Sequence, residues 1–340
     1  MMNLKDLGWN RHFSIHFKNF KEQGLIPARV FTEGRKNYTL FSKKGELSAN
    51  ARGLLWHQKS TKTETPVVGD WVAIELLPEK NIALIKAVIR RKNSFSRRTS
   101  GGRKKIGGGE VSEQIIAANV DLALIVVGLD RDFNLRRIER YMTLVQSNGA
   151  EPIIILNKSD LCDEKQIRKK EVKKLFPNTN VRTLVALNKK DVSSLKKFIK
   201  PGMTVAVLGS SGVGKSTLIN QLLGYDKQFV KNISNKAGKG QHTTSHRELI
   251  ILPEGGIIMD NPGMREIQLW GDEDDLWETF ADIDHHAQEC KFRNCRHENE
   301  PQCAVRDAVD KGRVDKKRFD NYLKLRSELG ELQKKQQKKR

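Results

Sequence analysis

The sequence has few of the features that mark secreted or membrane proteins. It has four cysteines in 340 residues, and no apolar run approaches the ~18 residues of a membrane span. Its first residues, MMNLKDLGWNRHF, lack the apolar segment of a secretory signal. We therefore expect a cytoplasmic protein without a membrane partner. In a reducing compartment, the three cysteines between 290 and 303 suit a metal better than disulfides.

Acidic residues are scarce relative to basic ones. The chain has 41 Asp and Glu against 62 Lys and Arg, which gives a net charge of +21. Because such an excess adds self-repulsion unless a polyanion is bound, RNA is the expected partner, ahead of an anionic membrane surface or a basic surface kept for solubility. The length and the 37% hydrophobic content predict two or three globular domains.

The hydrophobic pattern changes along the chain. Between Ala28 and Asn93, short runs such as VVGDWVAIEL predict a small β domain. The next segment, up to Glu113, is rich in Arg, Lys, Gly and Ser and predicts a flexible basic linker, either a tether or a phosphate contact. From Val120 onward, apolar runs such as VDLALIVVGL, EPIIILN and RTLVAL alternate with helical segments, which predicts an α/β domain with a parallel sheet.

A glycine-rich segment follows the apolar run TVAVL and matches the phosphate-binding loop G-x-x-x-x-G-K-[ST]. Glycine frees successive backbone N–H groups to surround phosphates at a helix N-terminus. We expect Lys215 to contact the β- and γ-phosphates and Ser216 to bind Mg²⁺. The predicted nucleotide contacts in this loop are Gly209, Ser210, Ser211, Gly212, Val213, Gly214, Lys215, Ser216 and Thr217.

The segment NKSD predicts which base is bound. The Asp160 carboxylate can accept from two adjacent donors of guanine, whereas adenine would leave it unpaired. Asn157 would address the other edge of the purine, and Lys158 would lay its stem along the base plane. The alternative is a turn in which Ser or Asp caps the following helix. The phosphate loop elsewhere in the chain favours GTP and GDP as ligands.

Two later segments resemble switch elements of GTPases. DNPG, at the end of the apolar run GGIIMD, places Asp260 to reach Mg²⁺ through water and the Gly263 N–H to contact the γ-phosphate. It also fits a simple Asn-Pro-Gly turn. Upstream, the polar segment GQHTT offers Thr243 or Thr244 as a Mg²⁺ ligand, and spacing does not choose between them; we assign Thr244.

The order of these motifs is inverted, because NKSD comes before the phosphate loop. This order predicts a circularly permuted GTPase, which a doubly wound sheet tolerates because its chain ends lie close together. The γ-phosphate-sensing segment then lies near the exit of the domain, and Gly263 precedes Cys290 by 290 − 263 = 27 residues.

With these motifs in place, the chain resembles the bacterial small ribosomal subunit biogenesis GTPase family RsgA over almost its whole length. The matching stretches include PVVGDWV, FNLRRIERYMTL, LNKSDL, GSSGVGKSTLIN and GQHTT. The resemblance implies an N-terminal OB-fold β-barrel, a central α/β permuted P-loop GTPase domain and a C-terminal α-helical zinc-binding domain. The expected ranges are 1–27 for an extension, 28–100 for the RNA-binding OB-fold, 101–114 for the linker, 115–275 for the GTPase domain and 276–340 for the zinc domain with its basic helix.

The resemblance also implies GTP hydrolysis that is stimulated by the small ribosomal subunit during its late maturation, with hydrolysis driving release. Met264 stands where Ras-like enzymes have a water-positioning glutamine, so we expect slow intrinsic turnover. His242 is the family's candidate to orient water, or else a mobile histidine near phosphate. The expected catalytic residues are Lys215, His242 and Thr244. VAL at 185–187 only loosely resembles a guanine-contact loop, so Ala186 is not assigned to the site.

The cysteine-rich segment offers a complete tetrahedral ligand set. Cys290, Cys295, His297 and Cys303 supply three thiolates and one imidazole, which predicts one structural zinc ion with no open position. The binding of zinc would supply much of the folding free energy of this short polar segment. Reduced cysteines without a ligand are the alternative.

The expected partner is the small ribosomal subunit and its rRNA. An OB-fold presents a β face and loops to single-stranded nucleic acid, and Arg52, Trp56, Arg97 and Arg98 are candidate contacts. Two alternatives stay open: a nucleotide-gated assembly chaperone without catalysis, or a permuted GTPase that acts on the large subunit. We expect a monomer, because no long coiled-coil repeat is present.

Overall fold

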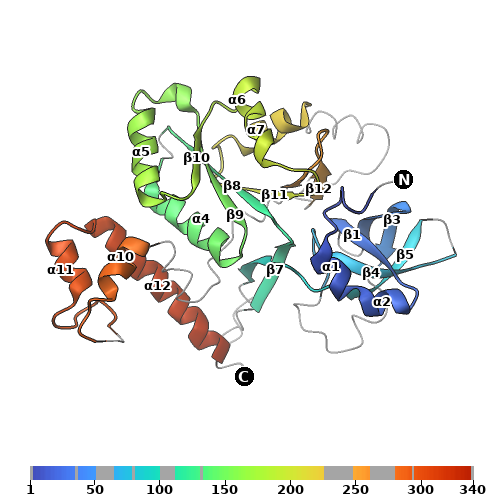
Figure 1. The fold of residues 1–340 in the computed structure, drawn as a ribbon, viewed down its shortest axis with the longest axis horizontal. Helices are drawn as coiled ribbons and strands as arrows, with labels where there is room; N and C mark the ends of the chain where they lie inside the picture. Colours follow the sequence, from blue (N-terminus) through green and yellow to red (C-terminus); the bar gives the residue numbers. More distant parts are fainter. Residues whose placement is uncertain are drawn as a thin grey trace, which may run out of the picture. The chain divides into compact units, whose positions relative to one another are not determined.

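The computed structural model describes residues 3–34, 37–50, 65–78, 81–99, 112–130, 133–225, 248–260, 280–292 and 295–337. The chain forms two compact units. The first contains Met1–Phe133 and Gly149–Ile267, and the second contains Asn134–Asn148 and Gln268–Arg340. Figure 1 shows the elements of each unit.

The N-terminal part of the first unit is a five-stranded barrel, as the resemblance implies. Its strands are β1 (Ile26–Glu33), β2 (Asn37–Ser42), β3 (Gly45–Asn50), β4 (Trp71–Leu76) and β5 (Ile82–Val88). They pair in the order β1-β2-β3-β5-β4, and β4 pairs again with β1. The β3–β5 pair is parallel and the others are antiparallel. Alternate side chains fill the interior, including Val30, Leu40 and Ile74.

Two short helices precede the barrel, α1 (Arg11–His16) and α2 (Lys18–Glu22), in the segment that the sequence predicts only as an extension. Asn10 caps α1 by accepting a hydrogen bond from the backbone N–H of His12. Trp9 and Phe13 pack on the buried Trp71 of β4, with ring centroids 4.7 and 5.8 Å apart. The aromatic contacts attach this segment to the barrel.

The second part of the first unit is the expected α/β sheet. Its strands are β8 (Leu122–Gly128), β9 (Glu151–Asn157), β10 (Asn180–Thr183), β11 (Thr204–Leu208), β12 (Glu248–Ile251) and β13 (Ile257–Asp260). The order is β10-β9-β8-β11-β13-β12, parallel except for β12. The prediction that RTLVAL is a strand is wrong for its second half, because β10 ends at Thr183. Residues 184–187 form a turn instead, and this turn contributes to the site described below.

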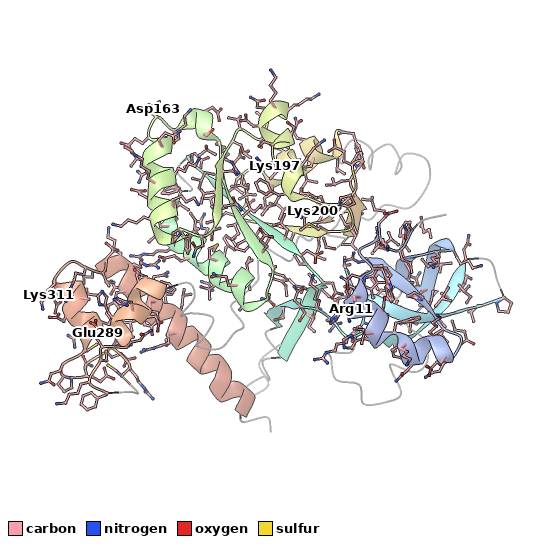
Figure 2. All side chains as sticks on the ribbon, viewed as in Figure 1. Arg11, Asp163, Lys197, Lys200, Glu289 and Lys311 are labelled. Carbon is pink, nitrogen blue, oxygen red and sulfur yellow. The ribbon has the colours of Figure 1, made fainter. Side chains whose placement is uncertain are left out.

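Helices and short turns connect these strands. The helices are α5 (Lys165–Leu175), α6 (Lys189–Ser193) and α7 (Lys215–Leu223), and the 3-10 turns are η1 (Ser159–Leu161) and η2 (Lys196–Phe198). Strands β8 and β11 are buried along their whole length, which explains their continuous apolar sequences. Exposed lysines such as Lys197 and Lys200 lie on the surface around η2 (Figure 2).

The barrel and the α/β sheet are joined inside the first unit. Strand β1 pairs with β12 at Thr32 and Glu248, so the two parts share one sheet of 11 strands. The fully buried Arg29 of β1 donates to the Thr204 hydroxyl of β11 at 2.6 Å and to the Leu7 carbonyl. Burial lowers the pKa of Arg29 to about 10, and Asp121 and Asp70 oppose the shift.

A separate two-stranded ladder flanks the basic segment. Strand β6 (Ser94–Thr99) pairs antiparallel with β7 (Ser112–Ala118). The second strand begins within the range expected for the linker. Residues 100–111 of that segment lie outside the described residues.

The second unit is helical. It contains α4 (Leu135–Ser147), α10 (Ala281–Ala287), α11 (Ala304–Asp310) and α12 (Lys316–Gln337). Its buried Glu139 accepts from Arg318 of α12 and, at 2.6 Å, from Asn321, while Arg318 also donates to Asp282 at 2.8 Å. This network fixes α4 to the C-terminal helices. No described helix combines the length and apolarity needed to cross a membrane.

Candidate functional site

The phosphate loop runs from the end of β11 into α7, as the sequence predicts. Gly209, Gly212 and Gly214 have φ values of 143°, 81° and 98°, where other residues are strained. A Cβ on Gly209 would lie 2.2 Å from the Val126 carbonyl oxygen. The turn is therefore tight against β8, and its glycines are required by both backbone conformation and space.

Lys215, the first residue of α7, folds back over this turn. Its Nζ donates to the Gly209 carbonyl oxygen at 2.8 Å and to that of Ser210. The ammonium group lies inside the curve of the loop, at a helix N-terminus that attracts anions. Ser216 is exposed and Thr217 half-buried on the same first turn of the helix.

Asn157 at the end of β9 connects three segments of the site. Its Nδ2 donates to the Val213 carbonyl oxygen of the phosphate loop at 2.7 Å, and its Oδ1 accepts from the Ala186 N–H at 2.8 Å. The side chain is 2% exposed. The absence of a side chain at Gly214 provides the space for this amide, because a Cβ there would lie 2.3 Å from Asn157 Nδ2. Asn157 thus ties the base motif to the phosphate loop, a structural role that the sequence did not predict.

Lys158 and Asp160 follow Asn157 and point away from the core. Lys158 has φ 58° and ψ 39°, a left-handed conformation that is costly for a residue with a side chain. The Asp160 carboxylate is exposed and has no hydrogen bond or ion pair within the described part of the chain. It is available to the donors of a ligand.

Ala186 lies in the site through its backbone N–H, although it was not assigned to the site from the sequence. It lies in the turn after β10, where the Asp191 carboxylate accepts from the Val185 N–H at 2.9 Å and Asn188 caps α6. This turn holds the Ala186 N–H against Asn157. The available signal was the Asn-x-x-Asp pattern at 188–191, which marks the start of a helix.

Of the remaining predicted nucleotide and RNA contacts, the structure describes only Asp260 with its side chain. Asp260 ends β13, which is parallel to β11, so it lies at the same edge of the sheet as the phosphate loop. His242, Thr243, Thr244 and Gly263 lie outside the described residues. So do Arg52 and Trp56 of the barrel, and the side chains of Arg97 and Arg98 are likewise not described.

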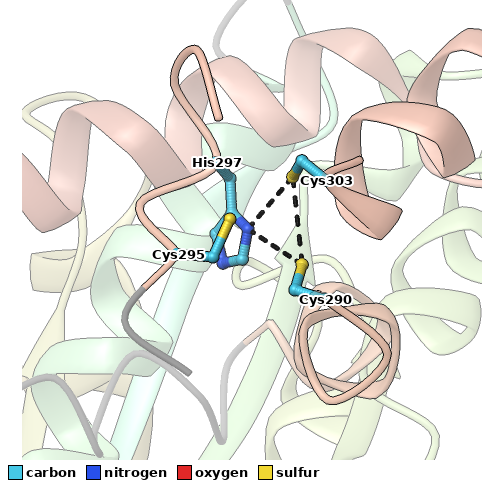
Figure 3. Close-up of side chains that lie close together, drawn as sticks. All are labelled: Cys290, Cys295, His297 and Cys303. Carbon is cyan, nitrogen blue, oxygen red and sulfur yellow. Dashed lines mark hydrogen bonds between the residues drawn. The ribbon is translucent and has the colours of Figure 1, made fainter. Parts of the chain in front are cut away.

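The four predicted metal ligands of the second unit come together (Figure 3). Their ligand atoms all lie within 4.8 Å of one another. Cys290 Sγ is 3.9 Å from Cys303 Sγ and 3.6 Å from His297 Nδ1, and His297 Nδ1 is 3.3 Å from Cys303 Sγ. Tetrahedral ligands around Zn²⁺ would be about 3.8 Å apart for two sulfurs and about 3.5 Å for sulfur and nitrogen. The cluster fits a metal ion of this size.

The segments between the ligands are mostly turns. Cys290 follows α10 and Cys303 precedes α11. His297 has a left-handed φ of 61°, and the Glu300 carboxylate accepts from the N–H groups of Arg296 and Glu298 at 2.9 Å each. Glu300 therefore stabilises the turn that carries His297. Nothing in the sequence indicated this role except that Glu300 lies near His297 in the chain.

The protonation of the cluster depends on burial. Burial, together with the neighbouring Cys303 and Cys290, raises the pKa of the Cys295 thiol to about 12, and a hydrogen bond from the His297 backbone N–H opposes the rise. Burial also lowers the pKa of His297, which keeps its imidazole neutral as a metal ligand must be. Three crowded thiols deprotonate readily only beside a cation, so the donor set favours a divalent, thiolate-binding metal.

The fold and the site define a circularly permuted GTPase, because a base motif on β9 meets a phosphate loop that comes later in the chain. The sequence profile described as RsgA GTPase matches residues 88–270, and one described as 50S ribosome-binding GTPase matches residues 204–337. The chain belongs to the RsgA family.

Relatives named "Small ribosomal subunit biogenesis GTPase RsgA" match most of the chain. Those of Syntrophotalea carbinolica and Opitutus terrae are each 44% identical, over 96% of this chain and 90% of the relative. Among solved structures, YjeQ from Thermotoga maritima is 25% identical with a TM-score of 0.65, and covers 90% of this chain and 98% of its own. YloQ, described as a circularly permuted GTPase, has the same fold at 23% identity and a TM-score of 0.62.

Proposed function

We propose that this GTPase binds GTP at the edge formed by β8, β9 and β11 and hydrolyses it on the small ribosomal subunit during late maturation, with hydrolysis driving release. The observation that carries the proposal is the Asn157 bridge, which joins the guanine motif to the phosphate loop. The names of the 44% identical relatives support the small subunit as the partner.

The geometry of the strand ends supports a specific set of nucleotide contacts. Asp160 would accept from the guanine ring, and Lys158 would lie along it. The N–H groups of the phosphate loop and the Lys215 ammonium would bind the β- and γ-phosphates, and Ser216 with Thr244 would bind Mg²⁺. The metal supplies charge neutralisation between the phosphates. Asp260 and Gly263 would contact the metal shell and the γ-phosphate.

Slow turnover without the ribosome is part of this proposal. Met264 occupies the position after Gly263, so the chain has no glutamine there to orient water. We assign that task to His242, to be completed on the small subunit. A reaction that is slow alone and fast on the subunit would couple release to correct docking.

Zinc in the second unit and RNA contacts in the first complete the proposal. Cys290, Cys295, His297 and Cys303 would hold one structural Zn²⁺. The barrel, the basic segment 101–114 and the C-terminal lysines would contact rRNA phosphates, which position a protein without reading sequence. We place the action in the cytoplasm, where the subunit is, and expect a monomer.

The test is phosphate release from GTP, with ATP as the control, alone and with purified small or large subunits. We expect strong stimulation by the small subunit only. Stimulation by the large subunit instead would favour the second ribosomal alternative, which the profile named for 50S binding makes worth testing. Nucleotide binding without phosphate release on either subunit would favour a nucleotide-gated assembly chaperone.

Lys215→Ala gives the matched variant for this assay. Loss of the ammonium removes the main charge that faces the phosphates, so we expect hydrolysis to fall by at least about 100-fold. Circular dichroism should be unchanged, because the Lys215 Nζ donates to carbonyl oxygens of the partly exposed phosphate loop and not to the apolar core. Lys197→Ala, an exposed lysine outside the loop, serves as the control.

A further inference from the structure

Asp130 is not among the residues proposed above to contact the nucleotide, yet its side chain contacts one of those residues, Lys158. It lies just beyond β8, and its Oδ2 accepts from Lys158 Nζ at 2.6 Å. The two side chains are 28% and 30% exposed. An ion pair at this depth is less screened by solvent than one on an open surface.

The backbone holds both partners in place. Gly128 of β8 is in register with Asn157 of β9, and the Leu129 N–H donates to the Asn157 carbonyl oxygen at 2.8 Å. Asp130 and Lys158 thus leave adjacent strand ends. The left-handed conformation of Lys158 sets the direction in which its side chain leaves the backbone, and the ion pair with Asp130 holds the far end of that side chain.

Gly128 provides the space for this carboxylate. A Cβ at that position would lie 2.6 Å from Asp130 Oδ1, so the side chain of Asp130 folds back over the glycine. Because the contact is with the end of a side chain, Gly128→Ala would move the carboxylate more easily than the strand. This variant displaces Asp130 without removing it.

We infer that Asp130 is a positioning residue of the guanine site, which holds the Lys158 ammonium so that the aliphatic stem lies ready for the base. The inference rests on the proposed function. A free lysine side chain loses rotamer freedom when it is fixed against a ligand, and an ion pair formed in advance removes part of that loss. The effect should be on nucleotide affinity, equally for GTP and GDP.

The experiment is titration of the full-length protein with GDP, GTP and 2′-deoxy-GDP. We expect Asp130→Ala to weaken all three by about tenfold, which would appear in KM and not in kcat. Asp130→Glu should recover part of the affinity. Asp163→Asn, which removes an exposed carboxylate near the start of α5, is the control for net charge and should change nothing (Figure 2).

A double-mutant cycle with Lys158→Met separates positioning from a general structural role. If Asp130 acts through Lys158, Asp130→Ala should cause no further loss in the Lys158→Met protein. An equal loss in both backgrounds, unchanged affinity in Asp130→Ala, or a loss confined to nucleotides with a 2′-hydroxyl would each overturn the inference. If the wild type fails to prefer GDP over ADP, the proposed function itself fails.

Discussion

The guanine site and the cysteine cluster are built in opposite ways. In the first, parallel strands fix the positions of Asn157 and the phosphate loop, and a 2% exposed amide ties them together. In the second, four ligands come from turns next to short helices, and two non-glycine residues, His297 and Gln302, have left-handed φ values near 60°. The first site is held by its sheet, while the second has little regular structure of its own.

This difference indicates where each site obtains its rigidity. Backbone ladders and a buried apolar core hold the strand ends. The cysteine segment buries few large apolar side chains, so we expect its order to depend on bonds to the proposed metal ion and on packing such as that of Phe280 on Tyr322, whose ring centroids are 5.6 Å apart. Metal loss should therefore damage the second unit and spare the first.

The largest expected effect is that of metal removal. Chelation, or Cys290→Ser, should unfold the turns around the cluster, because structural zinc contributes about 10 kcal/mol or more in small metal-dependent domains. Limited proteolysis and metal content would report the loss, and GDP binding should persist. Cys162→Ser, outside the cluster, is the control. A second unit that resists protease equally well without metal would contradict the comparison.

A smaller effect, confined to the first unit, is expected from Asn157→Ala. The change leaves the Ala186 N–H and the Val213 carbonyl without their partner, at about 1–3 kcal/mol for each unsatisfied group. Calorimetric titration should show GDP affinity reduced by roughly 10- to 100-fold, with metal content unchanged. The exposed Asn178→Ala provides the control. Unaltered affinity would show that the bridge does not hold the loop.

The smallest effect concerns pH and the helices beside the metal cluster. Burial raises the pKa of Glu139, and Arg318 opposes the rise. The folded state then binds this proton more tightly than the unfolded chain, so the contribution of Glu139 to the free energy of unfolding is greatest at low pH. That contribution is lost as pH rises from the unfolded pKa, about 4.3, through the folded one.

Glu139→Gln removes this titration and leaves the shape of the side chain. The melting temperature of the wild type relative to the variant should therefore decrease between pH 4 and pH 7, by about 1–3 °C. Effects of acid on the metal ligands are common to both proteins and cancel in the difference. A difference that increases with pH would mean that Arg318 outweighs burial.

Much of the fold was predictable because its signals are local. Continuous apolar runs marked β8, β9 and β11, and glycine spacing marked the loop before α7. The end of β10 was predicted wrongly, because Leu184 and Ala186 are buried in the turn and apolar content cannot distinguish a buried turn from a strand. Helices α1 and α2 were missed because Trp9 and Phe13 are ordered by contact with a distant strand.

In the candidate sites, too, some features were predictable from the sequence and others were not. The residues of the two nucleotide motifs and the four candidate metal ligands were predicted from spacing, and the structure places the four candidate ligands in one cluster that could hold a metal ion. The bridge role of Asn157, the entry of Ala186 and the Asp130 contact were not predictable. Each depends on which strand lies beside which, and β8, β9 and β10 are separated by long stretches of sequence.

The sequence by itself determined the chemical groups of this protein: a phosphate loop, a guanine motif in inverted order and a Cys₃His set that could bind a metal, because each is defined by residue type at short spacing. It also determined an excess of basic residues, which composition alone defines. Only the tertiary structure decided how these parts are held, through the register of β8 with β9, the Arg29 contact with Thr204 and the attachment of α4 to α12 by Glu139 and Arg318. Such contacts join residues far apart in the chain, and their energies depend on burial and geometry that no local pattern encodes.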